Sequence, residues 1–233
     1  MLYKRILMLF IVICCTTPNF AIANEIVSPF NGKDLSGWTT KEPKDRSHWQ
    51  VGKASLKADT PQQIINRGDG KSLINIQSQG VDIYTESKFT DVRIELEVMV
   101  PKGSNSGIYV MGEYEVQVFD SFSKEKLGGG DMGAIYGATP ARVNAQTEPG
   151  TWNEYMIEFR APRFDAEGKR TEKAKFIKVK LNGKTIHENV EMNGPTPSGV
   201  TGKESPEGGP LMFQGDHGPV SFRNIKIHVV KIP

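Results

Sequence analysis

The sequence predicts an all-β protein built as an antiparallel β-sandwich or jelly roll. Apolar and polar residues alternate in several short runs, which is the period of a strand with one buried face. Gly, Pro, Asn and Asp separate these runs, as expected of turns between strands. No window shows a convincing helical repeat, so the sheets are expected to lack helical crossovers.

The clearest strand covers residues 92–100. Every second residue in it is valine, isoleucine or leucine, and Arg93, Glu95 and Glu97 stand between them. One face of this strand is therefore expected to be buried and the other wet.

Further strands are expected at residues 108–111 and 114–119, joined by a tight turn at Gly112-Glu113. Residues 152–160 form another run with apolar positions. No internal repeat, linker or second domain is visible along these runs, so one domain is expected over residues 24–233.

The last part of the chain predicts a hairpin and a bulged strand. Asn182-Gly183 follows a run at residues 176–181 and suits a hairpin turn, because both residues tolerate positive φ. Residues 185–187 would be the return strand. In residues 220–230 the apolar positions change phase, which predicts a β-bulge near Arg223-Asn224.

The first 23 residues have the pattern of a secretory signal peptide. Lys4 and Arg5 precede an apolar run over residues 6–15, and Ala21-Ile22-Ala23 offers a cleavage site after Ala23. A run of this length is too short for a membrane span, which takes about 20 residues. A periplasmic or secreted protein is expected. Acylation at Cys14 or Cys15 is the weaker alternative, because no small residue precedes either one.

Removal of this leader changes the composition that matters for function. The whole chain carries 29 Lys and Arg against 27 Asp and Glu, and the leader holds two of the basic residues and both cysteines. The remaining chain would be neutral and free of thiols. A general nucleic-acid binder would carry a basic excess, and cysteine nucleophiles, disulfides and cysteine–metal sites are ruled out.

One strand carries a row of polar side chains. Within residues 114–120, Glu115 and Gln117 share a face and the valines between them take the other. A bulge near Phe119 would bring Asp120 to the face of Glu115. The spacing E-x-Q-x-x-D is similar to the E-x-D-x-x-E pattern of laminarinase-like glycosidases. The plainer alternative is a polar row on a solvated sheet edge.

Other polar residues stand near likely strand ends and loops elsewhere in the chain. His217 follows an apolar run and Gln214, Arg223 interrupts the last strand, and Asn105 opens another. Tyr136 closes a glycine-rich loop. Each of these has an ordinary structural explanation when taken alone, and a lone loop histidine is usually exposed or hydrogen-bonded.

Taken together, the motifs resemble the 3-keto-disaccharide hydrolase family. The resemblance extends over nearly the whole chain after the leader and consists of eight short segments in the family's order. These are FNGKDLSGW at 30–38, NSGI at 105–108, YEVQVFD at 114–120, GAIY at 133–136, WN at 152–153, LNG at 181–183, FQGDHG at 213–218 and FRNI at 222–225.

The resemblance implies a concanavalin-like or laminarinase-like jelly roll that acts on glycosides already oxidised to a ketone at C3. A C3 ketone acidifies the hydrogen at C2, so a base can remove it to give an enolate. The aglycone then leaves from C1 by elimination, and water adds afterwards. Such a site needs a base, a group that stabilises the enolate, and an acid for the departing oxygen.

These roles can be distributed over nine residues. Glu115 or His217 is expected to be the base, Arg223 or Gln117 to stabilise the enolate oxygen, and Asp120 or Tyr136 to orient the sugar or donate a proton. Asn105, Tyr109 and Gln214 are expected to contact substrate, and Tyr109 and Trp152 are candidates for stacking on the sugar. A divalent cation such as Ca²⁺ or Mn²⁺ could serve as a Lewis acid in a carboxylate and imidazole cluster.

Two other functions remain open at this point. A non-catalytic carbohydrate-binding module would bind sugar without turnover. An ordinary glycosidase would need two carboxylates at a fixed separation, for which Glu115 and Asp120 are the available pair. The partner in each case is a carbohydrate, and the sequence does not indicate an oligomeric state.

Overall fold

A computed structural model of the protein describes residues 25–233. The predicted signal peptide at residues 1–23 lies outside the described residues. Strands β1 to β17 and one short 3-10 helix, η1 (Lys44–Arg46), make up the regular structure of residues 25–233. Within the same residues, no helix is long and apolar enough to cross a membrane.

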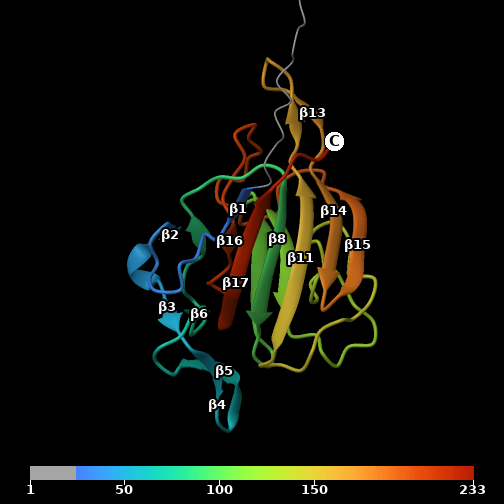
Figure 1. Cartoon of the computed structure of the whole chain (residues 1–233). Coiled ribbons are helices and arrows are strands. Elements are labelled where there is room, and N and C mark those ends of the chain that lie inside the picture. The colour runs from blue at the N-terminus through green and yellow to red at the C-terminus, as the bar shows by residue number, and fades with distance from the viewer. Residues whose placement is uncertain (1–24) are drawn as a thin grey trace, which may run out of the picture.

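The larger of two sheets has eight strands in the order β15-β14-β11-β8-β17-β6-β3, with β1 paired to β17. Figure 1 shows β17, β8, β11, β14 and β15 side by side across the front of the molecule. Their bounds are β1 (Glu25–Val27), β3 (Trp49–Gly52), β6 (Ser72–Asn75), β8 (Val92–Met99), β11 (Trp152–Arg160), β14 (Lys175–Leu181), β15 (Lys184–Glu191) and β17 (Val220–Val229).

The smaller sheet has five strands in the order β10-β9-β16-β7-β2. Two hairpins, β4–β5 and β12–β13, stand outside both sheets; in Figure 1 β4 and β5 project below the sandwich. The bounds are β2 (Trp38–Thr40), β4 (Ala54–Lys57), β5 (Thr60–Asn66), β7 (Ile83–Thr85), β9 (Asn105–Val110), β10 (Tyr114–Phe119), β12 (Arg163–Phe164), β13 (Arg170–Glu172) and β16 (Met212–Phe213).

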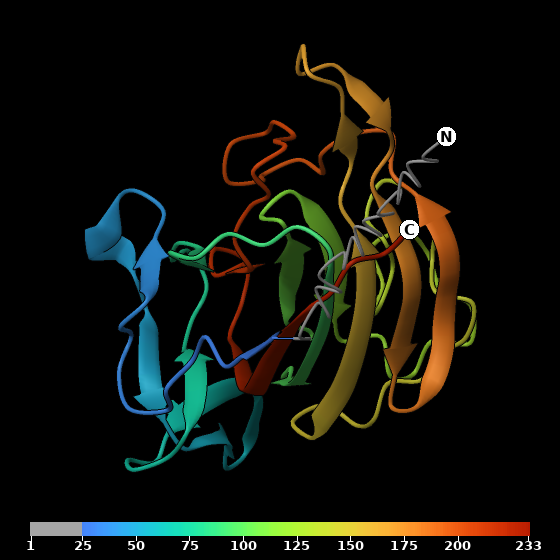
Figure 2. The ribbon, with the colours of Figure 1, turned by 45° about the horizontal axis from the view of Figure 1, so that its top comes forward.

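The two sheets pack face to face around one apolar core. The alternating apolar residues of β8 point inward, as do Val116 and Val118 of β10. Phe213 of the smaller sheet stacks on Phe222 of the larger one, with ring centroids 3.8 Å apart. Figure 2 shows β14 and β15, in orange, at the opposite side of the molecule from the blue N-terminal strands. The predicted all-β antiparallel sandwich is confirmed.

Most predicted strands lie where the alternation placed them. Residues 114–119 and 152–160 coincide with β10 and β11, and β8 ends one residue before the predicted run does. Asn182 and Gly183 have φ of 49° and 77°, as the predicted hairpin turn requires. The return strand, β15, is longer than the predicted run at residues 185–187 and continues to Glu191.

The predicted bulge in the last strand is present. The pairing of β17 with β8 shifts register between Arg223 and Lys226, and Asn224 has a φ of 53°. The bulge returns Ile225 and Ile227 to the core after Phe222, which is the reason for the phase change in the sequence.

Candidate active site

Seven of the nine predicted site residues line one hollow on the outer face of the smaller sheet. The hollow has a volume of about 130 Å³. Its lining consists of Asn105, Tyr109, Glu115, Gln117, Tyr136, Pro197, Ser198, Gln214 and His217. Residues from five separate segments of the chain therefore converge on it.

Strand pairing explains why the polar side chains of β9 and β10 share this face. Glu115 lies directly opposite Tyr109, and Gln117 lies opposite Gly107. Residues in register across two strands point to the same side of a sheet. The valines of β10 take the other side and join the core.

Gly107 makes room for the carboxylate. A Cβ atom at this position would lie 2.4 Å from Glu115 Oε1, closer than a carbon and an oxygen can approach. The carboxylate of Glu115 thus lies directly over the glycine backbone. This is a close approach that only glycine permits without displacement of Glu115.

Glu115 is a buried carboxylate, with only 4% of its surface exposed. The Tyr109 hydroxyl donates to Glu115 Oε2 over 3.0 Å. Burial raises the pKa of Glu115 to about 7, although the Tyr109 hydrogen bond and the nearby His217 lower it; the charges of Asp82 and Asp216 raise it further. A group with this pKa can take up and release a proton near neutral pH.

Gln117 and Tyr136 stand beside Glu115. Gln117 Nε2 donates to Asn105 Oδ1 over 2.7 Å, and both side chains line the hollow. The backbone N–H of Tyr136 donates to the carbonyl of Glu115 over 3.1 Å, so the glycine-rich loop runs along the edge of β10. The Tyr136 side chain is 40% exposed at the rim.

The loop after β16 contributes the histidine. His217 Nδ1 lies 2.5 Å from Asp216 Oδ1, and about half of each side chain is exposed. Gln214 is held at the base of the loop, where its backbone N–H donates to Gly107 over 3.0 Å. His217 therefore reaches the hollow from the open side, and Glu115 from the sheet.

A covering loop, residues 193–210, closes the hollow on another side. The buried carboxylate of Glu113 accepts hydrogen bonds from the Thr201 N–H and hydroxyl and from the Gly202 N–H. The Thr196 hydroxyl accepts from the Glu115 N–H over 3.1 Å. These contacts hold the loop against the turn between β9 and β10.

The ion pair between Lys41 and Asp82 links the covering loop to the loop after β16. Lys41 Nζ lies 2.9 Å from Asp82 Oδ2 and donates to the Ser198 carbonyl over 2.7 Å. The other carboxylate oxygen of Asp82 accepts from the Gly215 N–H over 2.9 Å. Sequence reasoning missed Lys41, Asp82 and Glu113, because no motif spacing connects them. The one available signal was Asp82 itself, a charged residue between Val81 and Ile83.

Asp120 does not join the site, so the predicted bulge at Phe119 is wrong. The pairing of β9 and β10 keeps its register to the end of the strand at Phe119. Asp120 follows the strand, and its Oδ2 accepts from the Gly103 N–H over 2.9 Å. Its carboxylate also accepts from the Phe122 N–H over 3.3 Å, and both bonds serve the adjoining loops.

Arg223 also lies elsewhere, on the outer face of the larger sheet. Its Nη2 is 2.6 Å from Glu97 Oε2, and its guanidinium lies over the Trp152 ring at 4.0 Å. Arg223 follows Phe222 in the regular part of β17, before the bulge, so it points to the outer face while Phe222 points into the core. The prediction that Arg223 and Trp152 contact the sugar with Glu115 is therefore corrected by their position in the other sheet.

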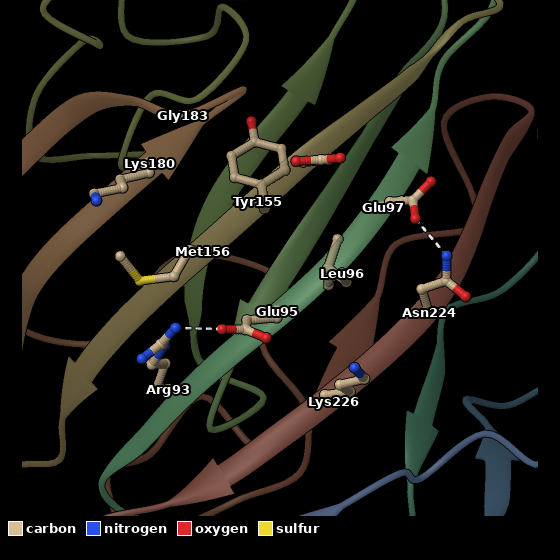
Figure 3. A pocket seen from close by; sticks show the side chains of 11 residues that line it. Arg93, Glu95, Leu96, Glu97, Tyr155, Met156, Lys180, Gly183, Asn224 and Lys226 are labelled. Atoms are coloured by element: carbon tan, nitrogen blue, oxygen red, sulfur yellow. Dashed lines mark hydrogen bonds and ion pairs between the residues drawn. The ribbon is translucent and has the colours of Figure 1, made fainter.

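A wider hollow of about 480 Å³ lies on that same outer face, across β17, β8, β11 and β14 (Figure 3). Two of the three carboxylates that line it have charged partners: Glu95 pairs with Arg93, and Glu97 pairs with Arg223 and also accepts from the Asn224 amide. Burial acts to raise the pKa of Glu95, but the Arg93 guanidinium outweighs it and the pKa is lowered. Glu95 and Glu97 are therefore held by neighbouring cations and are poorly suited to act as a base.

No group of three or more His, Cys, Asp or Glu side chains within residues 25–233 is arranged to hold a metal ion. In the site, His217 lines the hollow with Glu115, and Asp216 contacts His217.

Comparison with known proteins gives a family and a set of structural relatives. The profile of the 3-keto-alpha-glucoside-1,2-lyase-like domain matches residues 25–228. The comparison with curated proteins found no match.

Three solved structures from Parabacteroides distasonis ATCC 8503, each described as a candidate glycosyl hydrolase, are similar to this chain. The first is 27% identical with a TM-score of 0.67, and the match covers 88% of this chain and 84% of that one. The second is 18% identical with a TM-score of 0.60, covering 88% of this chain and 94% of that one. The third is 19% identical with a TM-score of 0.55, covering 89% and 100%.

Proposed function

The chain belongs to the 3-keto-alpha-glucoside-1,2-lyase-like family and is a carbohydrate-active jelly-roll enzyme, and from that premise we propose that it cleaves 3-keto-glycosides. The proposed reaction is removal of the C2 hydrogen, elimination of the aglycone from C1, and addition of water. One observation carries the proposal: a buried carboxylate whose pKa is raised to about 7 faces a polar hollow.

Glu115 is the base in this mechanism. It takes the C2 proton, and the electron pair of the C–H bond forms an enolate with the C3 carbonyl. The enolate then re-forms the ketone, the electron pair makes the C1–C2 double bond, and the bond from C1 to the aglycone oxygen breaks. The departing oxygen takes a proton, for which His217 and Tyr136 are the candidates at the rim of the hollow.

Hydration completes the reaction. The hydroxyl group of a water molecule adds to C1, and the proton that this water releases restores the acid that protonated the aglycone. Glu115 returns its proton to C2, so the base is regenerated and the net change is hydrolysis. The Gln117 side chain lies beside Glu115 and is placed to hydrogen-bond the sugar while charge develops on the C3 oxygen.

Two substrates separate this function from its alternatives. The purified protein is offered a 3-keto-glucoside and the parent glucoside with the same chromogenic aglycone. Release of aglycone from the ketone alone supports the proposal. Release from the parent as well favours an ordinary glycosidase, and binding without release favours a carbohydrate-binding module.

The structure of the site weighs against the ordinary glycosidase. That reaction needs two carboxylates flanking the bond that breaks, at about 5 to 9.5 Å. The pair considered from the sequence was Glu115 and Asp120, and Asp120 instead accepts bonds from loop N–H groups. Glu115 is thus left without the partner carboxylate that the sequence suggested.

Export and a divalent cation are separate proposals. We expect the leader to be cleaved after Ala23, which N-terminal sequencing of protein from the periplasm or medium would test. A chelator titration would test the cation: turnover lost with chelator and restored by Ca²⁺ or Mn²⁺ would support it. Unchanged turnover would leave Glu115, His217 and Tyr136 to act alone.

A further inference from the structure

The Tyr109 hydroxyl lies between two acceptors. It is 3.0 Å from Glu115 Oε2 and 3.1 Å from the carbonyl oxygen of Pro197 in the covering loop. A phenol has one proton to donate, so the two hydrogen bonds cannot both be made in full at the same time. Burial and the neighbouring Glu115 carboxylate raise the pKa of Tyr109 far above its usual value, so the hydroxyl keeps its proton.

The surroundings leave Glu115 few other partners. Its carboxylate lies over Gly107, which has no side chain to offer a hydrogen bond. The charged and titratable groups that act on Glu115 are Tyr109 of β9, Asp82 just before β7, and Asp216 and His217 of the loop after β16. Tyr109 alone among these donates a hydrogen bond to the carboxylate in the described structure.

We propose that Tyr109 is a positioning residue whose hydroxyl moves between two acceptors as Glu115 gains and loses a proton. When Glu115 is ionised, the hydroxyl donates to its Oε2. When Glu115 is protonated, the Glu115 O–H donates to the Tyr109 oxygen, and the Tyr109 O–H turns to the Pro197 carbonyl. Glu115 then has a hydrogen-bond partner in both states.

No proton leaves Tyr109 in this exchange. The hydroxyl rotates about its C–O bond, and the proton that Glu115 carries comes from outside, from water or from the substrate. A buried polar group is destabilised when it loses its hydrogen-bond partner, so a donor with a fixed direction would favour one protonation state of Glu115. The second acceptor removes that bias, which suits a base that must later return its proton.

The covering loop supplies the second acceptor, and Glu113 holds that loop. Pro197 lies between Thr196, which accepts from the Glu115 N–H, and Ser198, whose carbonyl accepts from Lys41. Hydrogen bonds therefore fix both neighbours of Pro197, Thr196 to β10 and Ser198 to Lys41. The carbonyl of Pro197 stays within reach of Tyr109 because of these contacts.

The test is a pH-difference infrared spectrum of the purified protein without substrate. We expect the protonated-carboxyl band of Glu115 to appear as pH falls, together with a shift of one tyrosine C–O band. Glu115→Gln should remove both bands, and Tyr109→Phe should remove the tyrosine band. Tyr84→Phe is the matched control, since Tyr84 lies on the same face, in register with Met212, but does not line this hollow.

A carboxyl band that titrates with no accompanying tyrosine band overturns the proposal, and so does a Glu115 that stays ionised throughout. The role in turnover rests on the proposed function, but the spectrum needs no substrate. An inactive protein that shows both bands would contradict the proposed function and support the inference about Tyr109. An active protein without the tyrosine band would do the reverse.

Kinetics give a second measurement on active protein. A fixed donor would favour only the ionised form, so its loss in Tyr109→Phe would raise the pH midpoint of kcat/KM by about 1 to 2. The moving hydroxyl favours both forms, and its loss should shift the midpoint by less than about 1 while kcat falls about 10-fold or more. A midpoint raised by the larger amount contradicts the proposal.

Discussion

The outer faces of the two sheets carry similar sequence patterns and have opposite chemistry. On β8, Glu95 and Glu97 alternate with core residues, just as Glu115 and Gln117 do on β10. On the larger sheet, Glu95 and Glu97 each pair with an arginine, and the pKa of Glu95 is lowered. On the smaller sheet, loops cover the face, and burial raises the pKa of Glu115 to about 7.

The two faces differ in the loops that cover them and not in the sequence pattern of their strands. Pro197, Ser198, Tyr136 and His217 all come from loops that close over the smaller sheet. Among residues 25–233, the hollow of the larger sheet (Figure 3) is lined by its strands and by Gly183 of the β14–β15 turn, and no covering loop lines it. A carboxylate on a strand becomes a candidate base when the tertiary structure removes water from it.

The largest expected effect separates the two faces directly. Glu115→Gln should lower turnover of a 3-keto-glucoside by about 10²–10⁴-fold, because it removes the base. Glu95→Gln, the matched change on the larger sheet, should leave turnover within about twofold, since Glu95 does not reach the hollow. Aglycone release measures both, and equal losses in the two variants would erase the distinction.

Stability should depend on pH with opposite sign on the two faces. The pKa of Glu115 in the fold, about 7, exceeds its ordinary value of 4.5, so its contribution is fully present below pH 4.5 and is lost as pH rises to 7. The difference amounts to about 3 kcal/mol at most. The pKa of Glu95 is lowered, so its contribution is present above its ordinary pKa and lost on acidification.

Urea denaturation from pH 3 to 8 checks this. Glu115→Gln should flatten the decline in stability between pH 4.5 and 7, and Glu95→Gln should remove part of the loss in acid. A parallel response in the two variants would contradict the assignment of Glu115 as buried and Glu95 as paired.

Gly107→Ala tests the space under Glu115. The new Cβ would meet Glu115 Oε1 at 2.4 Å, so the carboxylate must move. We expect turnover to fall about 10- to 100-fold and stability by about 1–3 kcal/mol. Gly129→Ala is the control, because no atom lies within 4 Å of a Cβ placed there. Full activity of Gly107→Ala would mean that Glu115 does not need its present position.

The smallest expected effect belongs to Arg223. Its guanidinium pairs with Glu97 and lies over Trp152, with 37% of the side chain exposed. Arg223→Ala should reduce stability by about 0.5–1 kcal/mol and turnover by less than about twofold. Gln117→Ala, in the hollow, should reduce turnover at least about 10-fold. A large kinetic loss in Arg223→Ala would place it back among the site residues.

The hydrophobic alternation predicted the strands well because it reports one local fact, which residues of a strand face the core. The limits of β10 and β11, the turn at Asn182-Gly183 and the bulge near Arg223 all follow from neighbours in sequence. The longer β15 did not follow, because its end depends on pairing with β14.

For the site, the motifs led to seven of the residues that line the hollow. Asp120 and Arg223 were assigned to it because of their residue types. Asp120 instead accepts from the Gly103 N–H, and Arg223 pairs with Glu97 on the larger sheet. Lys41 and Asp82 were missed because their importance lies in contacts to Ser198 and Gly215, far away along the chain.

By itself the sequence determined the architecture and the family: alternation, turn residues and ordered motifs specify an antiparallel sandwich and place Glu115 and Gln117 on one face. The tertiary structure decided which of the two polar faces holds a carboxylate that is shielded from water. Desolvation depends on what packs over a side chain, and the covering loops come from positions distant in the chain. No local pattern contains that information.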